Sequence, residues 1–284
     1  MHDLRTLKHF GCSLPVLFRA GAFGVLALAA TSQAFAAVYS VQIPSNEYGN
    51  LDQHDMLVLP TMSCGPASTA NALLYLQNAA PSIYGSKLTP SADYGGLISL
   101  ADTLTGPGYM NTDSINGTWH DNLIMATKNY IESEVAGQTS YSAQDYWSWN
   151  HQRRPAWTQP VTPTWNFIYQ ALTISDAVDI LLTYNSGGGH FVTVNGFSWN
   201  DSNGNNIIDS GENAQLDFMN PWTGAEAINH IWQTSLNGPI ETDYSSSWIS
   251  TAFAMAIPVP EPSAFALVLV GAVGFGVCAW RRRR

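Results

Sequence analysis

Residues 62–77 read Met-Ser-Cys-Gly-Pro-Ala-Ser-Thr-Ala-Asn-Ala-Leu-Leu-Tyr-Leu-Gln. Apolar side chains recur at helical spacing from Ala67 onward and proline suits a first helical turn, so the stretch predicts a helix over 66–77. Cys64 stands immediately before that helix. Free backbone amides and the positive end of the helix dipole favour a thiolate there, which predicts a thiol pKa lowered from about 8.5 into a reactive range. Taken alone, a Cys-Gly-Pro turn is also compatible with a structural cap.

Around this stretch, helical patterns come first and strand patterns follow. The periodicity predicts a short strand over 38–43 and further helices over 97–104, 121–134 and 165–172. It then predicts strands over 177–184, 190–197 and 214–219. We therefore expect one α+β domain over 37–257, in which a helical part that carries the nucleophile packs on a C-terminal antiparallel sheet.

The intervening stretch 139–162 is aromatic and reads as irregular. It holds Trp147, Trp149 and Trp157 close to Arg153 and Arg154. These rings could line a substrate groove or bind sugar, but packing beneath a long loop is the simpler interpretation.

A second block places a histidine at the start of a strand. His190 follows three glycines and opens His-Phe-Val-Thr-Val-Asn-Gly-Phe. Asn220 ends the next predicted strand, where its amide can fix the imidazole tautomer. A nucleophile, a base and an orienting group are what thiol acyl transfer requires. His190 follows Cys64 by 126 residues and Asn220 follows it by 156, close to papain-type spacing.

Three blocks resemble the papain-like cysteine peptidases: Ser-Cys-Gly-Pro-Ala-Ser at 63–68, Gly-Gly-His-Phe-Val-Thr-Val-Asn-Gly-Phe at 188–197, and Asn-Pro-Trp-Thr-Gly at 220–224. The nearest branch is the peptidase family related to the domains that remove double-glycine leaders from bacteriocins. The blocks cover a small part of the chain. The resemblance implies a papain-like fold, with Cys64 as nucleophile and His190 as general base.

Two positions depart from that family. Asn220 stands where relatives carry aspartate before proline, although papain itself uses asparagine in this role. The family's oxyanion-hole glutamine lies about six residues before the cysteine, where this chain has Val58. Gln53 lies eleven residues ahead of Cys64 and needs a longer loop to reach the oxyanion. Without it, the backbone amide of Cys64 would act alone, a loss that typically lowers the rate about 100- to 1000-fold.

Residues 201–212 read Asp-Ser-Asn-Gly-Asn-Asn-Ile-Ile-Asp-Ser-Gly-Glu and match an EF-hand-type Ca²⁺ loop at every ligand position. The predicted ligands are Asp201, Asn203, Asn205, the carbonyl of Ile207, Asp209 and Glu212. Asn206 replaces the usual glycine but tolerates positive φ, and Ile208 is expected to point inward. No helix pair flanks the loop, so we expect a structural calcium between the strands of His190 and Asn220. A solvated polar loop is the alternative.

Composition narrows the class of protein. The chain is 45% hydrophobic with ten tryptophans, which argues against disorder. About twenty carboxylates in 37–262 face only four cations, Lys87, Lys128, Arg153 and Arg154. Such a surface repels nucleic acid, so we predict no nucleic-acid partner. Cys64 is the only cysteine between the two ends of the chain, which carry Cys12 and Cys278. An oxidising exterior favours paired cysteines or none, so a lone thiol indicates a function.

Residues 1–36 read as a secretory signal. They contain a positive region, an apolar stretch over 20–30 that is too short to span a bilayer, and the small-x-small pattern Ala34-Phe-Ala36. We predict export and cleavage after Ala36. An uncleaved anchor helix is the alternative.

Residues 258–284 form a second predicted segment outside the domain. Pro260-Glu-Pro262 precedes an uncharged apolar run over 263–280 and then four arginines over 281–284. As a helix the run reaches about 27 Å, enough for a membrane core, with the arginines on the cytoplasmic side. The segment resembles the PEP-CTERM sorting signal of bacteria that export proteins into a polysaccharide-rich surface layer. The resemblance implies cleavage by an exosortase-type membrane enzyme and an exopolysaccharide matrix as surroundings. A plain C-terminal anchor is the alternative.

These features together predict an exported cysteine peptidase that is sorted to the cell envelope or extracellular surface and acts on a peptide or protein. Two alternatives stay open. One is an inactive calcium-binding matrix protein on the same fold. The other is an amidase or transglutaminase-type acyl transferase, because the same three residues serve any acyl group.

Overall fold

The computed structural model describes residues 36–257. The predicted sorting tail (258–284) lies outside the described residues, as does the predicted signal up to residue 35. Within 36–257, no helix is both long and apolar enough to span a membrane.

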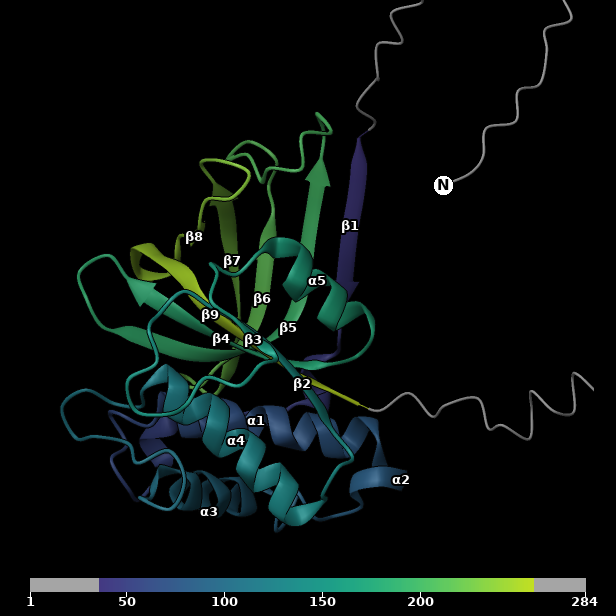
Figure 1. The fold of residues 1–284 in the computed structure, drawn as a ribbon. Coiled ribbons are helices and arrows are strands. Elements are labelled where there is room, and N and C mark those ends of the chain that lie inside the picture. Colours follow the sequence, from purple (N-terminus) through teal and green to yellow (C-terminus); the bar gives the residue numbers. More distant parts are fainter. Residues whose placement is uncertain (1–35, 258–284) are drawn as a thin grey trace, which may run out of the picture. The chain divides into compact units, whose positions relative to one another are not determined.

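Helices α1 to α4 gather on one side of the strands, whereas α5 lies against the strands themselves (Figure 1). The α-helices are α1 (Cys64–Ala79), α2 (Pro81–Tyr84), α3 (Tyr94–Thr105), α4 (His120–Glu134) and α5 (Trp165–Thr173). Three 3-10 helices are η1 (Ser45–Glu47), η2 (Gln53–Asp55) and η3 (Tyr244–Ser246). The four helices predicted from periodicity are confirmed: two are four residues longer than predicted and two are one residue longer. Because α1 begins at Cys64, the cysteine belongs to the first helical turn.

The strands form a single sheet that closes on itself. They are β1 (Ala37–Gln42), β2 (Ser140–Asp145), β3 (Thr158–Gln159), β4 (Ala177–Tyr184), β5 (Gly189–Asp201), β6 (Gln215–Asn220), β7 (Ala225–Gln233), β8 (Ile240–Thr242) and β9 (Ser247–Ala256). Antiparallel pairing runs from β4 through β5, β6, β7, β8 and β9 and returns to β4, so six strands make a closed barrel. β1 extends the sheet at β5, while β2 and β3 extend it at β9.

One prediction about the strands is wrong. The stretch 139–162, expected to be irregular, contains β2 and β3. The sequence Ser-Tyr-Ser-Ala-Gln-Asp has little apolar alternation, and it becomes a strand because all six of its residues pair with β9. That partner lies more than a hundred residues away, so the local pattern does not reveal the pairing.

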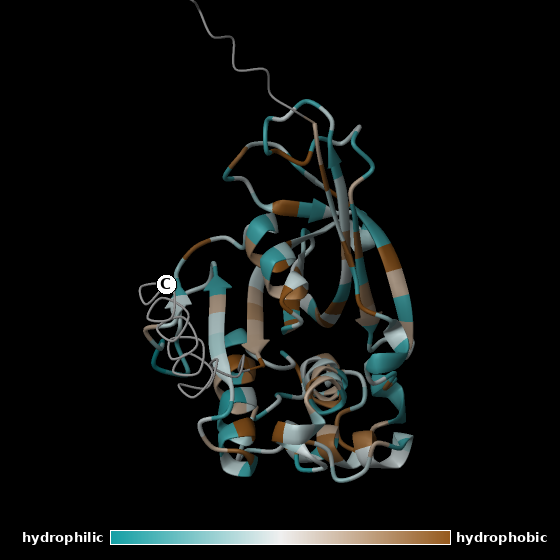
Figure 2. Cartoon of the chain, turned by 90° about the vertical axis from the view of Figure 1, so that its right-hand side faces the viewer, coloured by the Kyte–Doolittle hydropathy of each residue, from teal (hydrophilic) through white to brown (hydrophobic). Residues whose placement is uncertain are grey.

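Alternate residues of the strands serve two cores. Val178, Ile180 and Leu182 belong to a cluster inside the barrel, together with apolar residues of α5. Ala177 of the same strand belongs to the second cluster, which packs the helices against the outside of the barrel. Figure 2 shows polar and apolar residues alternating along several strands, as this division requires.

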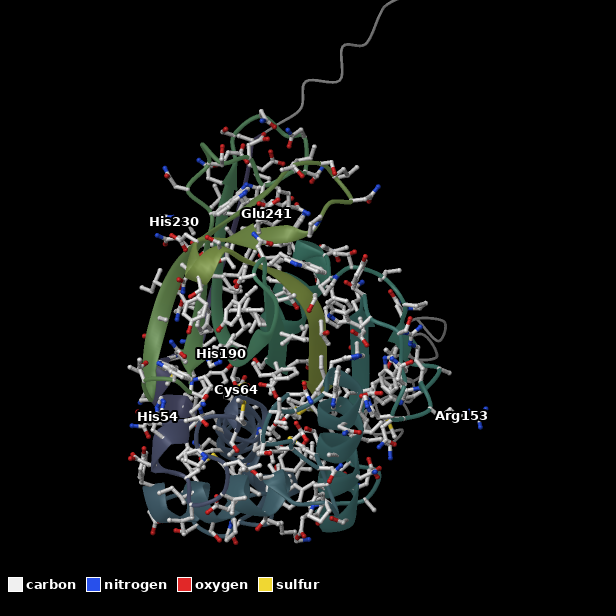
Figure 3. The ribbon with its side chains drawn as sticks, turned by 90° about the vertical axis from the view of Figure 1, so that its left-hand side faces the viewer. His54, Cys64, Arg153, His190, His230 and Glu241 are labelled. Carbon is white, nitrogen blue, oxygen red and sulfur yellow. The ribbon has the colours of Figure 1, made fainter. Side chains whose placement is uncertain are left out.

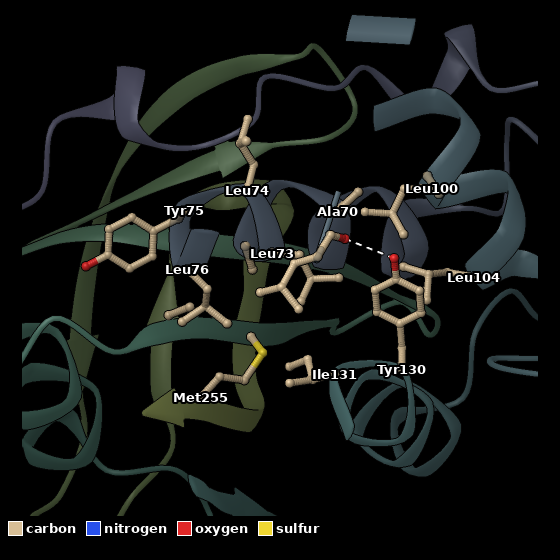
Figure 4. Close-up of a cluster of buried hydrophobic side chains, with 14 of the residues drawn as sticks. Ala70, Leu73, Leu74, Tyr75, Leu76, Leu100, Leu104, Tyr130, Ile131 and Met255 are labelled. Carbon is tan, nitrogen blue, oxygen red and sulfur yellow. Dashed lines mark hydrogen bonds between the residues drawn. The ribbon is translucent and has the colours of Figure 1, made fainter. Parts of the chain in front are cut away.

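Helix α1 is the centre of the second cluster. Every residue from Gly65 to Gln77 is buried. Figure 4 shows Leu73 and Leu76 among Leu100 and Leu104 of α3, Tyr130 and Ile131 of α4, and Met255 of β9. The Tyr130 hydroxyl donates to the carbonyl of Leu88 at 3.0 Å. Packing on all sides therefore fixes the helix that begins at Cys64.

Candidate active site

Cys64 lies where the helices meet the barrel. Its side chain is partly exposed, although the rest of the first turns of α1 is buried. Figure 3 shows Cys64 and His190 close together at this junction. The backbone amide of Phe191, the residue after His190, points at the Cys64 sulfur. The start of α1 therefore contacts the start of β5.

The predicted lowering of the thiol pKa is wrong in direction. Burial raises the pKa of Cys64, while the amides of Phe191, Gly65 and Cys64 itself oppose that rise. The free-energy cost of burying a thiolate is larger here than the stabilisation that the three amide dipoles give it. The neutral thiol is therefore the resting form.

Gly65 is required for packing. A Cβ atom at this position would lie 2.9 Å from the Cβ of Thr118 and 3.2 Å from a methyl group of Leu123. The close approach of the 112–118 loop therefore accounts for the glycine next to Cys64.

His190 and Asn220 meet at one end of the barrel. His190 is the second residue of β5 and Asn220 is the last residue of β6, its antiparallel neighbour. Both side chains are buried, and His190 Nε2 lies 2.9 Å from Asn220 Oδ1. The structure thus brings together the histidine and the asparagine that the sequence singled out.

The hydrogen bonds around Asn220 determine the tautomer of His190. The backbone N–H of Trp222 donates to Asn220 Oδ1 at 2.9 Å, so this atom is an acceptor. Nε2 of His190 must then carry the proton that it donates to the same oxygen. In the neutral ring, Nδ1 is consequently unprotonated and can accept a proton.

Two aromatic rings enclose the imidazole. Tyr244 stacks on His190 at 5.8 Å between ring centroids, and the edge of Trp222 approaches at 6.4 Å. This burial lowers the pKa of His190 to about 4, although the hydrogen bond from the ring to Asn220 opposes the shift. At neutral pH the site therefore pairs a thiol with an uncharged imidazole.

Gln53 lies between the segments that carry Cys64 and Asn220. Its backbone N–H donates to the carbonyl of Pro221 at 2.7 Å, and its side-chain amide donates to the carbonyl of Pro60 at 2.9 Å. The residue is 1% exposed, and its Oε1 has no hydrogen-bond partner among the described residues. One amide hydrogen of Nε2 remains for another acceptor.

The 201–212 loop shows two features expected of a calcium loop. Asn206 has a φ of 59°, and Ile208 is fully buried. The side-chain amides of Asn203 and Asn205 both donate to Asp209 Oδ2, at 2.7 and 2.9 Å. Three of the predicted ligand positions therefore already converge.

The carboxylates at the two ends of the loop bind protein donors. Asp201 accepts backbone N–H groups from Gly204, Asn205 and Asn206. Glu212 accepts from the Trp199 indole, from Ser202 and from the Asp209 backbone. Within residues 36–257 no three acidic, histidine or cysteine side chains form a metal-binding group. The donor set fits Ca²⁺ in chemistry. For both carboxylate oxygens of Glu212 to bind the ion, however, Glu212 must give up the hydrogen bonds that it accepts from Ser202 and from the Asp209 backbone.

Sequence reasoning missed the roles of Trp222 and Tyr244. Trp222 belongs to the Asn-Pro-Trp block, and its position two residues after Asn220 is the signal that the sequence offers. Tyr244 has no such signal, because barrel closure alone brings η3 to His190.

A scan against protein-family models finds no match to this chain, and neither does a search of curated proteins. The site therefore has to be interpreted from its own geometry.

Proposed function

We propose that this chain is a papain-like cysteine peptidase, exported and sorted to the cell surface. The observation that carries the proposal is the bond from His190 Nε2 to Asn220 Oδ1, which leaves Nδ1 as a proton acceptor at the strand end that contacts Cys64. A nucleophile, a base and an orienting amide on three rigid elements are what acyl transfer needs.

In the first half-reaction, Nδ1 of His190 takes the thiol proton as the Cys64 sulfur attacks the substrate carbonyl. The raised pKa of Cys64 and the lowered pKa of His190 both oppose a preformed ion pair, so the proton moves during the attack. His190 then gives this proton to the leaving amine, and a thioester remains on Cys64. Water, deprotonated by His190, hydrolyses the thioester and regenerates the thiol.

Two donors are available for the oxyanion. The N–H of Cys64 lies in the first turn of α1 and has no acceptor within the helix. The second proposed donor is the remaining N–H of the Gln53 side-chain amide. The hydrogen bond from this amide to the carbonyl of Pro60 holds it four residues before the nucleophile in the chain. A pair of such donors stabilises the tetrahedral intermediate.

Export, sorting and calcium belong to the same proposal. Residues 1–36 and 258–284 support export and cleavage by an exosortase-type enzyme through their sequence. Asp201, Asn203, Asn205, Ile207, Asp209 and Glu212 would hold Ca²⁺, which supplies positive charge that offsets the three carboxylates of the loop.

The decisive experiment is covalent labelling of the ectodomain, residues 37–257, with a peptide that carries a thiol-directed electrophile. An active peptidase gives stoichiometric labelling of Cys64 that His190→Ala slows severely. An inactive matrix protein gives labelling no faster than that of an unfolded thiol, and that result would refute the proposal. Adding a primary amine during peptide turnover separates the transferase alternative, because a transferase incorporates the amine in place of water.

A further inference from the structure

A row of large side chains crosses three strands of the barrel, β7, β8 and β9. Trp232 of β7 pairs with Glu241 of β8, and Glu241 pairs with Trp248 of β9. Directly paired residues project from the same face of a sheet, so these three side chains form a continuous row. The Trp232 indole donates to Glu241 Oε2 at 3.0 Å and holds the carboxylate in place.

A pocket of about 330 Å³ opens on this row, which is enough room for one extended side chain. Its lining residues are Tyr146, Thr162, Asn185, Pro239, Glu241 and Trp248. Tyr146 is 55% exposed, and its ring meets those of Trp147 and Trp248 edge-on at 5.2 Å. Aromatic faces and edges therefore surround one carboxylate.

Glu241 has no cationic partner of its own. Among residues 36–257 the only ion pairs join histidines to aspartates, and none includes Glu241. Glu241 is half-buried, and one of its carboxylate oxygens accepts the hydrogen bond from the Trp232 indole. A negative charge set against ring faces attracts a cation, because the ring quadrupole and the carboxylate act in the same direction.

Two chain segments connect the pocket to the proposed active site. Asn185 in the pocket wall lies three residues after Leu182, which pairs with His190 between β4 and β5. Glu241 lies three residues before Tyr244, which stacks on His190.

We propose that this pocket binds a lysine or arginine side chain of the peptide substrate. The inference rests on the proposed function, because it names a specificity pocket for the same peptidase. A single neutral sugar ring would also stack on Trp248, but it would leave the Glu241 charge without a counter-ion. The excess of carboxylates in this chain favours a cationic ligand in the same way.

The first test is a peptide series in which one position at a time is lysine, norleucine or glutamate. We expect one position at which lysine raises kcat/KM over norleucine by about tenfold and glutamate lowers it. Glu241→Gln should erase that preference, since glutamine keeps an acceptor for the Trp232 indole and loses only the charge. Glu134→Gln, an exposed site on α4, is the matched control and should keep the preference.

The second test does not depend on turnover. Cys64→Ala protein is titrated with the best lysine peptide, and binding is followed by tryptophan fluorescence. We expect saturable binding that Glu241→Gln weakens about tenfold and that Trp248→Ala removes. Equal affinity for the norleucine peptide, or binding of a neutral oligosaccharide alone, would overturn the pocket assignment. If Cys64 labels normally while the lysine preference is absent, the peptidase stands and only this inference fails.

Discussion

At the scale of single residues, the proposed reaction depends on the hydrogen bonds that Asn220 Oδ1 accepts. That atom accepts from the Trp222 backbone and from His190 Nε2, and both bonds are 2.9 Å long. An aspartate would accept in the same geometry but would add a charge in a buried place. Asparagine therefore fixes the imidazole tautomer and keeps the ring neutral.

Substituting the three residues one at a time should give a graded loss of activity. Cys64→Ala should abolish peptide hydrolysis, and His190→Ala should cost at least about 1000-fold, because nucleophile and base act as a unit. Asn220→Ala should cost about 10- to 100-fold, since Tyr244 and Trp222 still hold the ring. Single-turnover rates measure the losses, and melting temperatures control for folding. Wild-type-like hydrolysis by Cys64→Ala would show that another group performs the reaction.

The pH dependence of thiol reactivity tests the neutral resting state. The Cys64 pKa is raised and the His190 pKa is lowered to about 4, so no thiolate–imidazolium pair forms between pH 5 and 8. The rate of carboxamidomethylation by iodoacetamide should therefore climb with pH across that range and continue to climb above pH 8. A fast plateau from about pH 5 upward would instead indicate a preformed ion pair.

The sequence indicates the candidate catalytic residues more directly than it indicates the residues that surround them. Cys64, His190 and Asn220 each stand in a short sequence block, and the residue types in each block indicate the chemistry without any long-range information. The local sequence does not reveal the direction of the Cys64 pKa shift, because Phe191 and the residues that bury the thiol come from other parts of the chain. The contact of Tyr244 with His190 is likewise not predictable from the local sequence.

At the scale of secondary-structure elements, a buried polar joint links α1 to the barrel. Asp179 of β4 accepts from the hydroxyl of Ser68 and from that of Thr193, each at 2.8 Å. Ser68 lies one helical turn after Cys64, and Thr193 lies three residues after His190. The joint therefore fixes how the helix that begins at Cys64 packs against the strand that carries His190.

Burial raises the pKa of Asp179 to about 6, from an ordinary value near 4. A raised folded-state pKa means that the native state holds this proton more tightly than the unfolded chain does. Asp179 therefore lowers the free energy of unfolding as pH rises from about 4 to 6, and the loss is complete above that range.

Asp179→Asn should remove this penalty and keep the hydrogen bonds, because its Oδ1 accepts from Ser68 and Thr193 while its amide can donate to Thr69. We expect a gain of about 2 kcal/mol in the free energy of unfolding at pH 7.5 and no gain at pH 4. Urea unfolding at both pH values measures it, with Glu134→Gln as the control for a lost surface charge. A loss of stability at pH 7.5 would mean that the joint requires the carboxylate.

The local sequence pattern predicts the four longer helices and the strands β1, β4, β5 and β6, but it does not predict β2, β3 or the strands that close the barrel. The helix over 66–77 follows from local periodicity, and the structure confirms it. β2 has little apolar alternation and becomes a strand through its pairing with β9. The barrel itself closes because β4 pairs with β9, about seventy residues later in the chain. Pairing between residues so far apart in the chain produces no recognisable pattern in the local sequence.

At the scale of the whole molecule, the 201–212 loop occupies an unusual place in the topology. It is part of the connection from β5, which begins near His190, to β6, which ends at Asn220. Ile208 anchors the loop in the barrel core, and the Gln233 backbone of β7 donates to its carbonyl. The loop is therefore joined both to the barrel core and to the two strands that carry His190 and Asn220.

We expect Ca²⁺ to stabilise the ectodomain through this loop. Extracellular calcium modules bind at about 10⁻⁴–10⁻³ M, so millimolar calcium should add about 0.4–1.4 kcal/mol to the free energy of unfolding. For a domain of this size that corresponds to a melting temperature about 1–6 °C higher than with chelator. Turnover should fall on chelation as well, since the connection between the strands of His190 and Asn220 loosens.

Substitutions separate this effect from a general influence of ions. Glu212→Gln should lower the melting temperature in calcium to the value seen with chelator, and chelation should then change little. Ser210→Ala alters an exposed position that is not a ligand and should respond to calcium like the wild type. Melting curves, turnover rates and elemental analysis are measured on the same samples. If calcium moves neither quantity and none is found bound, the hydrogen bonds of Asp201, Asp209 and Glu212 already satisfy the loop, and it holds the two strands without an ion.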